Sequence, residues 1–126
     1  MKKTILLLFG LLCLWHVGAV AQTDADRAWI EANYRKTEYR IAMRDGIHLY
    51  TTVYAPRDTT ERHPILLTRT PYSCRPYGAE FSSSLWRSYL YEYARRGYIL
   101  VFQDVRGRWM SEGEFVQVRP YVEQAI

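Results

Sequence analysis

Alternating and continuous apolar positions predict a β-hairpin near the start of the chain. Residues 38–43 and 47–54 flank a turn at 44–46, and its Asp-Gly pair is a strong hairpin signal. One face of the second arm would carry Ile47, Leu49, Thr51 and Val53, since side chains alternate along a strand. Pro56 would end this arm, because proline has no N–H to donate.

Two further apolar runs predict strands at residues 65–70 and 98–102. The first run is β-branched and apolar, so we expect a buried strand that stops at Pro71. The proline ring also favours extended geometry at Thr70. The second run is continuously apolar, which is typical of a strand buried on both faces.

The residues between these two runs predict a helix over 82–96. Its apolar face repeats every four residues, at Phe81, Leu85, Tyr89 and Tyr93. Ser82 is expected to cap the start of the helix, and Gly97 to follow its end as the C′ residue. A strand, a helix and a strand joined by short links form a βαβ unit with parallel strands, so the fold class is α/β.

The first 36 residues predict a leader and a short helix. Residues 1–21 combine Lys2 and Lys3, an apolar stretch and a small-residue pattern before Gln22, as in a secretory signal peptide. The mature domain would therefore be residues 22–126, and the protein periplasmic or secreted. Residues 23–36 are polar with apolar positions at helical spacing, so we expect a short helix there.

The composition is that of a globular protein and excludes some partners. Of the 126 residues 48% are hydrophobic, and the formal charge is +4. Removal of Lys2 and Lys3 with the leader leaves 15 − 13 = +2, which argues against nucleic acid or another anionic partner. We expect no membrane contact after cleavage; the oligomeric state stays open. Cys74 would be the remaining thiol, either free and buried or paired beyond the chain.

The candidate chemistry lies where the two predicted parallel strands end. Tyr72 comes just past the carboxyl end of the first strand, where ligands bind in open α/β sheets. Its phenol is neutral at pH 7 and can donate one hydrogen bond. Asp104 and Arg106 leave the second strand; they could contact substrate, but such a pair more often fixes a loop. Ser111 is no nucleophile, since Trp109 stands where a nucleophile elbow has glycine.

Neither the histidines nor the cysteine predict a metal site, and we expect no cofactor. His48 would be a half-exposed strand residue, and His63 a loop residue beside Pro64. Neither has a partner at metal-ligand spacing.

Several motifs in order resemble the opening of the CocE/NonD-type α/β-hydrolases. That family joins cocaine esterase, α-amino-acid ester hydrolases, acylases and X-Pro dipeptidyl peptidases. The motifs are MRDGIHL at 43–49, TRTPY at 68–72, VFQDVRGR at 101–108 and SEGEF at 111–115. The resemblance runs from Tyr39 to Pro120. It implies the amino-terminal part of an α/β-hydrolase fold, with the Tyr72 hydroxyl as an oxyanion-hole donor.

The catalytic triad that the resemblance implies is absent. In this fold serine precedes the acid, and histidine comes last, whereas His16, His48 and His63 all lie early. We therefore expect an amino-terminal fragment, truncated before the nucleophile and inactive alone, of an exported serine hydrolase. Its substrates would be small esters, amides or short peptides, as in an acylase or α-amino-acid ester hydrolase. The alternatives are an X-Pro dipeptidyl peptidase and a non-catalytic binding module.

Overall fold

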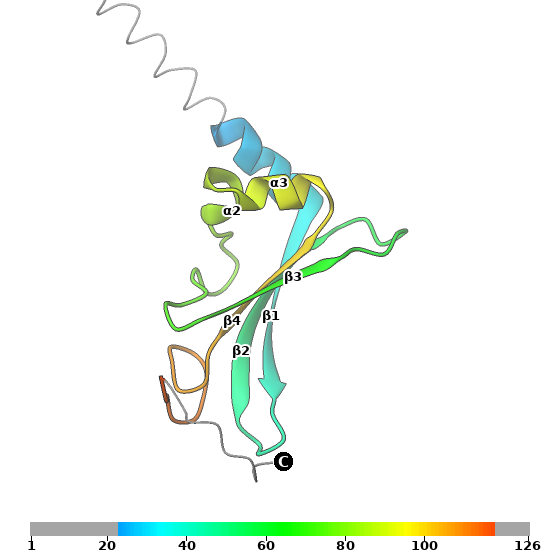
Figure 1. The fold of residues 1–126 in the computed structure, drawn as a ribbon. Helices are drawn as coiled ribbons and strands as arrows, with labels where there is room; N and C mark the ends of the chain where they lie inside the picture. The colour runs from blue at the N-terminus through cyan, green and yellow to red at the C-terminus, as the bar shows by residue number, and fades with distance from the viewer. Residues whose placement is uncertain (1–22, 118–126) are drawn as a thin grey trace, which may run out of the picture.

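The computed structural model describes residues 23–117, which form one mixed sheet with helices gathered at one of its ends (Figure 1). The strand order is β1-β2-β4-β3. The strands are β1 (Tyr34–Ala42), β2 (His48–Pro56), β3 (Ile65–Thr70) and β4 (Ile99–Asp104). The helices are α2 (Ser84–Arg87), α3 (Leu90–Arg95) and an unlabelled helical segment at 23–33. Within 23–117 no helix has the length and apolar character needed to span a membrane.

The predicted hairpin is confirmed as the antiparallel pair β1 and β2. Its turn closes through a 3.0 Å bond from the Gly46 N–H to the Met43 carbonyl, and Gly46 has a φ of +81°. β1 begins at Tyr34, so the helix predicted over 23–36 ends at 33. The buried Tyr34 hydroxyl lies 2.8 Å from the Ala94 and Tyr98 carbonyl oxygens, which ties the start of β1 to the end of α3.

The predicted parallel unit is confirmed, since β3 and β4 pair in parallel. The single helix predicted over 82–96 is wrong, because the backbone is extended at Ser88 between α2 and α3 (φ −137°, ψ 179°). The Ser88 hydroxyl donates to the Ser84 carbonyl at 2.7 Å and accepts the Leu90 N–H at 3.2 Å. Serine competes in this way for backbone groups that a helix would use.

The sequence predicted the end of the helical region correctly but not its start. The N-cap of α2 is Ser83, without a side-chain bond, and not Ser82. Gly97 is confirmed as the C′ residue of α3, with a φ of +78°. Its N–H donates to the Ala94 carbonyl, and the Tyr98 N–H to the Tyr93 carbonyl, which is the Schellman pattern.

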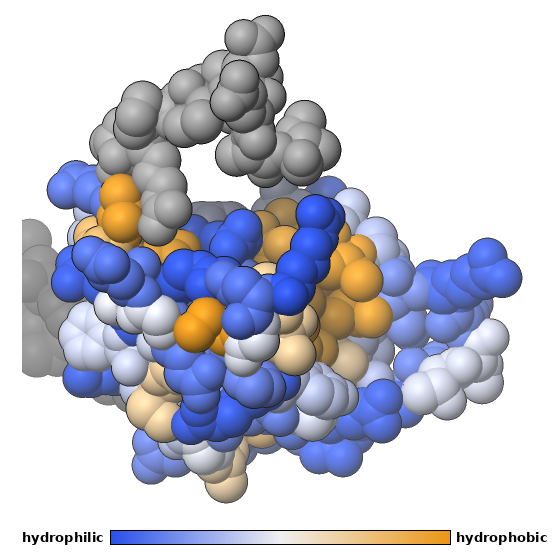
Figure 2. All heavy atoms as spheres, turned by 90° about the horizontal axis from the view of Figure 1, so that it is seen from below, coloured by the Kyte–Doolittle hydropathy of each residue, from blue (hydrophilic) through white to orange (hydrophobic). Residues whose placement is uncertain are grey.

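The expectation that residues 65–70 form a buried strand is wrong. β3 lies at the end of the described strand order and pairs with β4 alone. Ile65 is 66% exposed and Leu67 54% exposed, because nothing within residues 23–117 covers the sheet face that carries them. Leu66, on the other face, packs against the core. Orange apolar atoms lie among blue polar ones on the face seen from below (Figure 2).

The core lies between the sheet and the helices. β4 is internal and contributes the fully buried Leu100. A connected buried cluster surrounds it: Ile30, Tyr34, Tyr54, Leu85, Leu90 and Ala94. This packing fixes the sheet from the helical end and leaves the opposite end to loops. The predicted signal peptide (1–21) and the carboxyl end of the chain lie outside the described residues.

Candidate active site

Tyr72 lies just past the carboxyl end of β3, where the sequence predicted it. Its side chain is 84% exposed. Within residues 23–117 its hydroxyl makes no hydrogen bond, so the donor is available. The backbone around it is fixed instead: the Tyr72 N–H donates to Thr70 Oγ1 at 3.0 Å, and Trp109 Nε1–H donates to the Pro71 carbonyl at 2.9 Å. The oxyanion role of Tyr72 stays a prediction.

The turn after Tyr72 has an unusual backbone. Ser73 has a φ of +90°, which is uncommon for any residue other than glycine. The Ser73 hydroxyl lies 3.0 Å from the Tyr77 hydroxyl and accepts the Arg75 N–H at 3.1 Å. Such a conformation persists where the surroundings hold it, and it is often found at functional sites.

Asp104, at the end of β4, is fully buried and bonds to the loop that follows Tyr72. Its Oδ1 accepts the Cys74 N–H at 2.8 Å, and its Oδ2 accepts the Tyr77 hydroxyl at 2.9 Å. The Met110 N–H donates to Oδ2 at 3.3 Å. The loop-fixing role favoured by the sequence therefore fits Asp104.

Arg106 fixes a different loop from the one that Asp104 holds. Its guanidinium donates to both carboxylate oxygens of Asp45, at 2.8 and 3.2 Å. These bonds from Arg106 hold the pKa of Asp45 below its ordinary value. The two residues thus act separately and do not form a pair with each other.

Cys74 is free and buried, as one of the two predicted alternatives has it. Burial raises the pKa of its thiol to about 11. The Thr52 hydroxyl lies 3.8 Å from the sulfur. Because the thiolate is the nucleophilic form, Cys74 is unsuited to attack a carbonyl.

Ser111, which the sequence excluded as a nucleophile, bonds to two backbone groups. Its hydroxyl accepts the Tyr50 N–H at 2.8 Å and donates to the Asp104 carbonyl at 2.7 Å. The same loop bonds to the half-exposed His48, whose N–H and Nδ1 lie 2.9 and 3.0 Å from Glu112 Oε2. These contacts join the loop after β4 to the start of β2, where both lie at one end of the sheet (Figure 1).

A buried lysine, which sequence reasoning missed, holds the loop after Tyr72 in place. The side chain of Lys36 is 3% exposed, and its ammonium lies 3.1 Å from Glu38 Oε1. It donates to the carbonyls of Pro76, Gly78 and Glu80 at 2.6, 2.6 and 2.8 Å. The alternation along β1 places Lys36 and Glu38 on one face, but no local signal indicates the loop that they bind.

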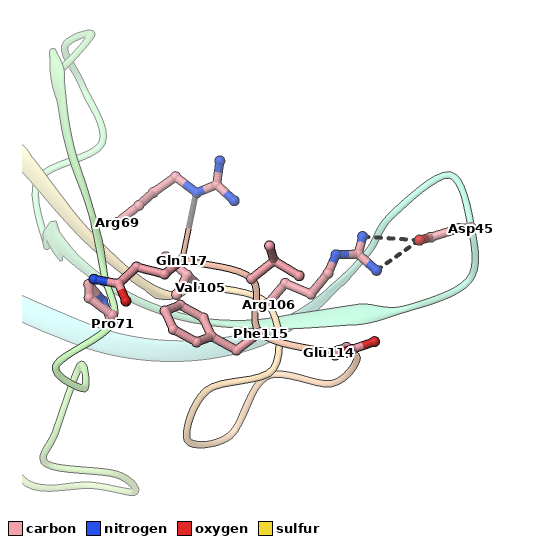
Figure 3. Close-up of a pocket in the computed structure, with 9 residues that line it drawn as sticks. Asp45, Arg69, Pro71, Val105, Arg106, Glu114, Phe115 and Gln117 are labelled. Atoms are coloured by element: carbon pink, nitrogen blue, oxygen red, sulfur yellow. Dashed lines mark hydrogen bonds and ion pairs between the residues drawn. The ribbon is translucent and has the colours of Figure 1, made fainter. Parts of the chain in front are cut away.

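An open cleft of about 520 Å³ adjoins the Tyr72 turn. Figure 3 shows Arg69 and Arg106 within it, with Arg106 directed at Asp45 in the hairpin turn. Its lining residues are Asp45, Arg69, Pro71, Val105, Arg106, Glu114, Phe115, Val116 and Gln117. Pro71 contributes to its wall, so the cleft begins beside the backbone that presents Tyr72. No group of three or more potential metal ligands occurs in the part of the chain that the structure describes.

Comparisons with known proteins agree on one family. The family model described as X-Pro dipeptidyl-peptidase (S15 family) matches residues 45–125. The cocaine esterase of Rhodococcus sp. (strain MB1 Bresler) is 36% identical over 96 residues, which cover 75% of this chain and 15% of that protein.

Two solved structures resemble the chain in sequence and fold. One is an α-amino acid ester hydrolase, with 39% identity, a TM-score of 0.57, and coverage of 71% of this chain and 15% of that one. The other is an aminopeptidase from a marine sediment archaeon (Thaumarchaeota archaeon), with 37% identity, a TM-score of 0.56, and coverage of 68% and 14%. The chain thus spans about 15% of the length of the curated relative that it matches.

Proposed function

Because the chain belongs to the X-Pro dipeptidyl-peptidase (S15) family of CocE/NonD-type hydrolases, we propose that it provides the oxyanion side of a serine hydrolase active site. The serine, acid and histidine of the triad would come from a longer protein of which this chain is the amino-terminal part. The low coverage of the relatives supports this arrangement. The α/β fold supports it too, since both solved relatives share it.

In the proposed reaction, a serine gives its proton to the histidine of the triad, and its oxygen bonds to the carbonyl carbon of an ester or amide; the histidine later gives that proton to the leaving group. The carbonyl oxygen takes the negative charge, and the Tyr72 hydroxyl and a backbone N–H beside the serine donate to it. The alcohol or amine then leaves with a proton, and water hydrolyses the acyl-enzyme. Donors aimed at charge that develops in the transition state are among the largest contributions to such catalysis.

One observation carries this proposal: the free, exposed hydroxyl of Tyr72 stands on a fixed backbone at the carboxyl end of β3. Tyr72 is 84% exposed, so its ring contributes little packing within residues 23–117. The anchored turn keeps the donor in place before substrate arrives, so little reorganisation accompanies the reaction.

The test of the reaction class is covalent labelling of the complete enzyme by a fluorophosphonate, which reacts with an activated serine. We expect stoichiometric labelling with parallel loss of ester hydrolysis. Hydrolysis that survives full exposure to the reagent would contradict the serine mechanism.

Within this class, we propose esters or amides of small acyl groups as the substrates, and X-Pro peptides as the second candidate. The esterase and ester-hydrolase relatives favour the first. The family name and the aminopeptidase relative favour the second. Values of kcat/KM on an amino-acid ester and on an X-Pro anilide would decide, since the preferred substrate should give the larger value.

We also propose that the protein is exported, on the strength of the leader pattern in residues 1–21. Amino-terminal sequencing of the mature protein should then begin at Gln22. A mature chain that retains Met1 would contradict cleavage.

A further inference from the structure

We propose that Asp104 is a positioning residue for Tyr72, a role that rests on the function proposed above. Asp104 ends β4 and Tyr72 follows β3, and these parallel strands are neighbours in register, with Thr70 opposite Asp104. The carboxylate therefore lies beside the turn that presents the phenol. The carboxylate bonds to residues that follow Tyr72 in this loop and not to the Tyr72 side chain.

The first contact holds the backbone on the far side of Ser73, the residue with the unusual conformation. The Cys74 N–H, two residues after Tyr72, donates to Asp104 Oδ1 at 2.8 Å. Between them stands Ser73 with a φ of +90°. A serine in this conformation needs outside support, and the bond from Cys74 to a fully buried carboxylate provides it.

The second contact braces the far side of the same loop. The Tyr77 hydroxyl donates to Asp104 Oδ2 at 2.9 Å and lies 3.0 Å from the Ser73 hydroxyl. The Tyr77 ring packs edge-on against Tyr50 in β2, with centroids 5.2 Å apart. Tyr77 thus connects Ser73, the carboxylate and the sheet.

The third contact brings in the loop after β4. The Met110 N–H donates to Asp104 Oδ2 at 3.3 Å, and the neighbouring Trp109 donates its Nε1–H to the Pro71 carbonyl at 2.9 Å. Trp109 itself has a φ of +52°, so its backbone is also held in an uncommon conformation. The residues on both sides of Tyr72 are therefore anchored by groups that converge on Asp104.

An ionised carboxylate suits this position better than its amide. Both of its oxygens accept, and together they take three donors from two loops. No ion pair to Asp104 occurs within residues 23–117, so hydrogen-bond donors compensate its burial. The substitution D104N would replace one oxygen by an NH₂ group, which would face an N–H or O–H donor at hydrogen-bond distance.

The test is a double-mutant cycle in the complete enzyme with D104N and Y72F. We expect D104N alone to lower kcat by about 10²-fold, since a displacement near 1 Å can cost that much. KM should change little, because the donor acts on charge of the transition state. In the Y72F background the same change should lower kcat by about twofold or less, since an effect transmitted through the hydroxyl cannot be lost twice.

Tyr77→Phe provides a second, milder route to the same test. It keeps the ring against Tyr50 and removes one donor from Asp104, so it preserves the fold if D104N does not. We expect Tyr77→Phe to lower kcat by about 10-fold when the Tyr72 hydroxyl is present. In the Y72F background it should change kcat little. Asp58→Asn is the matched control, since the Asp58 carboxylate bonds to Thr60 in its own exposed turn, away from Tyr72; it should leave kcat unchanged.

The outcomes separate this inference from the proposed function. If Y72F lowers kcat but D104N or Tyr77→Phe costs the same factor with and without the Tyr72 hydroxyl, the positioning role is overturned and the oxyanion role stands. If Y72F itself leaves kcat unchanged, both are overturned. Non-additive losses confined to kcat support both.

Discussion

The residues around Tyr72 divide into one exposed donor and a buried set that anchors it. Asp104, Cys74 and Ser111 are all buried and make backbone bonds, so each acts on geometry and not on a substrate. Tyr72 is the member of the group that solvent can reach freely. This division is what the proposed oxyanion role of Tyr72 requires.

At the residue scale, the Cys74 thiol should be inert in the folded protein. Burial raises its pKa to about 11, so at pH 8 only about one thiol in 10³ is ionised. Dithionitrobenzoate should therefore modify Cys74 only after unfolding in denaturant. Rapid stoichiometric labelling of the native enzyme, with other thiols replaced, would contradict this burial.

The place of Tyr72 could be predicted from sequence, whereas its anchors could not. Pro71, directly before Tyr72, is a local signal that ends the strand. The partners of Asp104 come from Cys74 and Tyr77, which are 30 and 27 residues away along the chain. No periodicity encodes a contact over that separation, so the sequence favoured a loop-fixing role for Asp104 but did not identify the residues that it bonds.

At the element scale, the strands of the hairpin hold the loops that surround the site. Lys36 in β1 binds three carbonyls of the loop after Tyr72, and Glu112 binds the start of β2. The sheet thus serves as the fixed frame against which both loops are placed.

Lys36→Met should destabilise the protein markedly. The change leaves three loop carbonyls without their charged donor, and a hydrogen bond to a charged group contributes about 1.5–3 kcal/mol. We expect a loss of about 3 kcal/mol or more in the free energy of unfolding, measured by denaturant titration. Arg40→Met is the control; its exposed pair with Glu112 at 3.7 Å should contribute about 0.5 kcal/mol or less. Equal losses in the two variants would contradict the anchoring role of Lys36.

The contact of Glu112 with β2 should make stability depend on pH. The His48 N–H, then the His48 ring and Arg40, hold the pKa of Glu112 below its ordinary value of 4.5. When folding lowers the pKa of a carboxyl, that carboxyl stabilises the folded state. The stabilisation is complete at a pH above the unfolded pKa and is lost as the pH falls through the folded pKa. The Tm of Glu112→Gln should therefore lie below that of the wild type at pH 6 and converge with it at more acidic pH.

Glu61→Gln, at an exposed residue between β2 and β3, is the control and should have the Tm of the wild type at pH 6. A Tm difference for Glu112→Gln that grows as pH falls would have the wrong sign and would contradict the assigned contact.

The elements themselves were predictable where the signal is local. The Asp-Gly turn and Gly97 each specify one backbone conformation, and both were confirmed. The break at Ser88 was missed because the four-residue apolar repeat continues through it. The burial of β3 was mispredicted because an apolar run does not reveal whether both faces of its strand are covered.

At the scale of the whole molecule, the exposed edge of the sheet at β3 is the prominent feature. Within residues 23–117 β3 pairs on one side alone, and the exposed Ile65 and Leu67 lie on one of its faces. Such strands promote association. Residues 22–126 expressed alone should therefore associate or lack cooperative unfolding. Sedimentation velocity and thermal unfolding would measure this, and Leu67→Lys should raise the monomer fraction. A monomeric, cooperatively unfolding wild-type product would favour the alternative of a non-catalytic binding module.

The most direct test of the central claim is kcat for Tyr72→Phe in the complete enzyme. Phenylalanine keeps the ring and removes only the hydroxyl, and the loss of one oxyanion donor costs about 10²–10³ in rate. KM and Tm should change little, since the exposed hydroxyl bonds to nothing within residues 23–117. Tyr89→Phe, at a ring that is 72% exposed, should leave kcat at the wild-type value. A Tyr72→Phe enzyme with the kcat of the wild type would contradict the assignment of Tyr72 to the oxyanion hole.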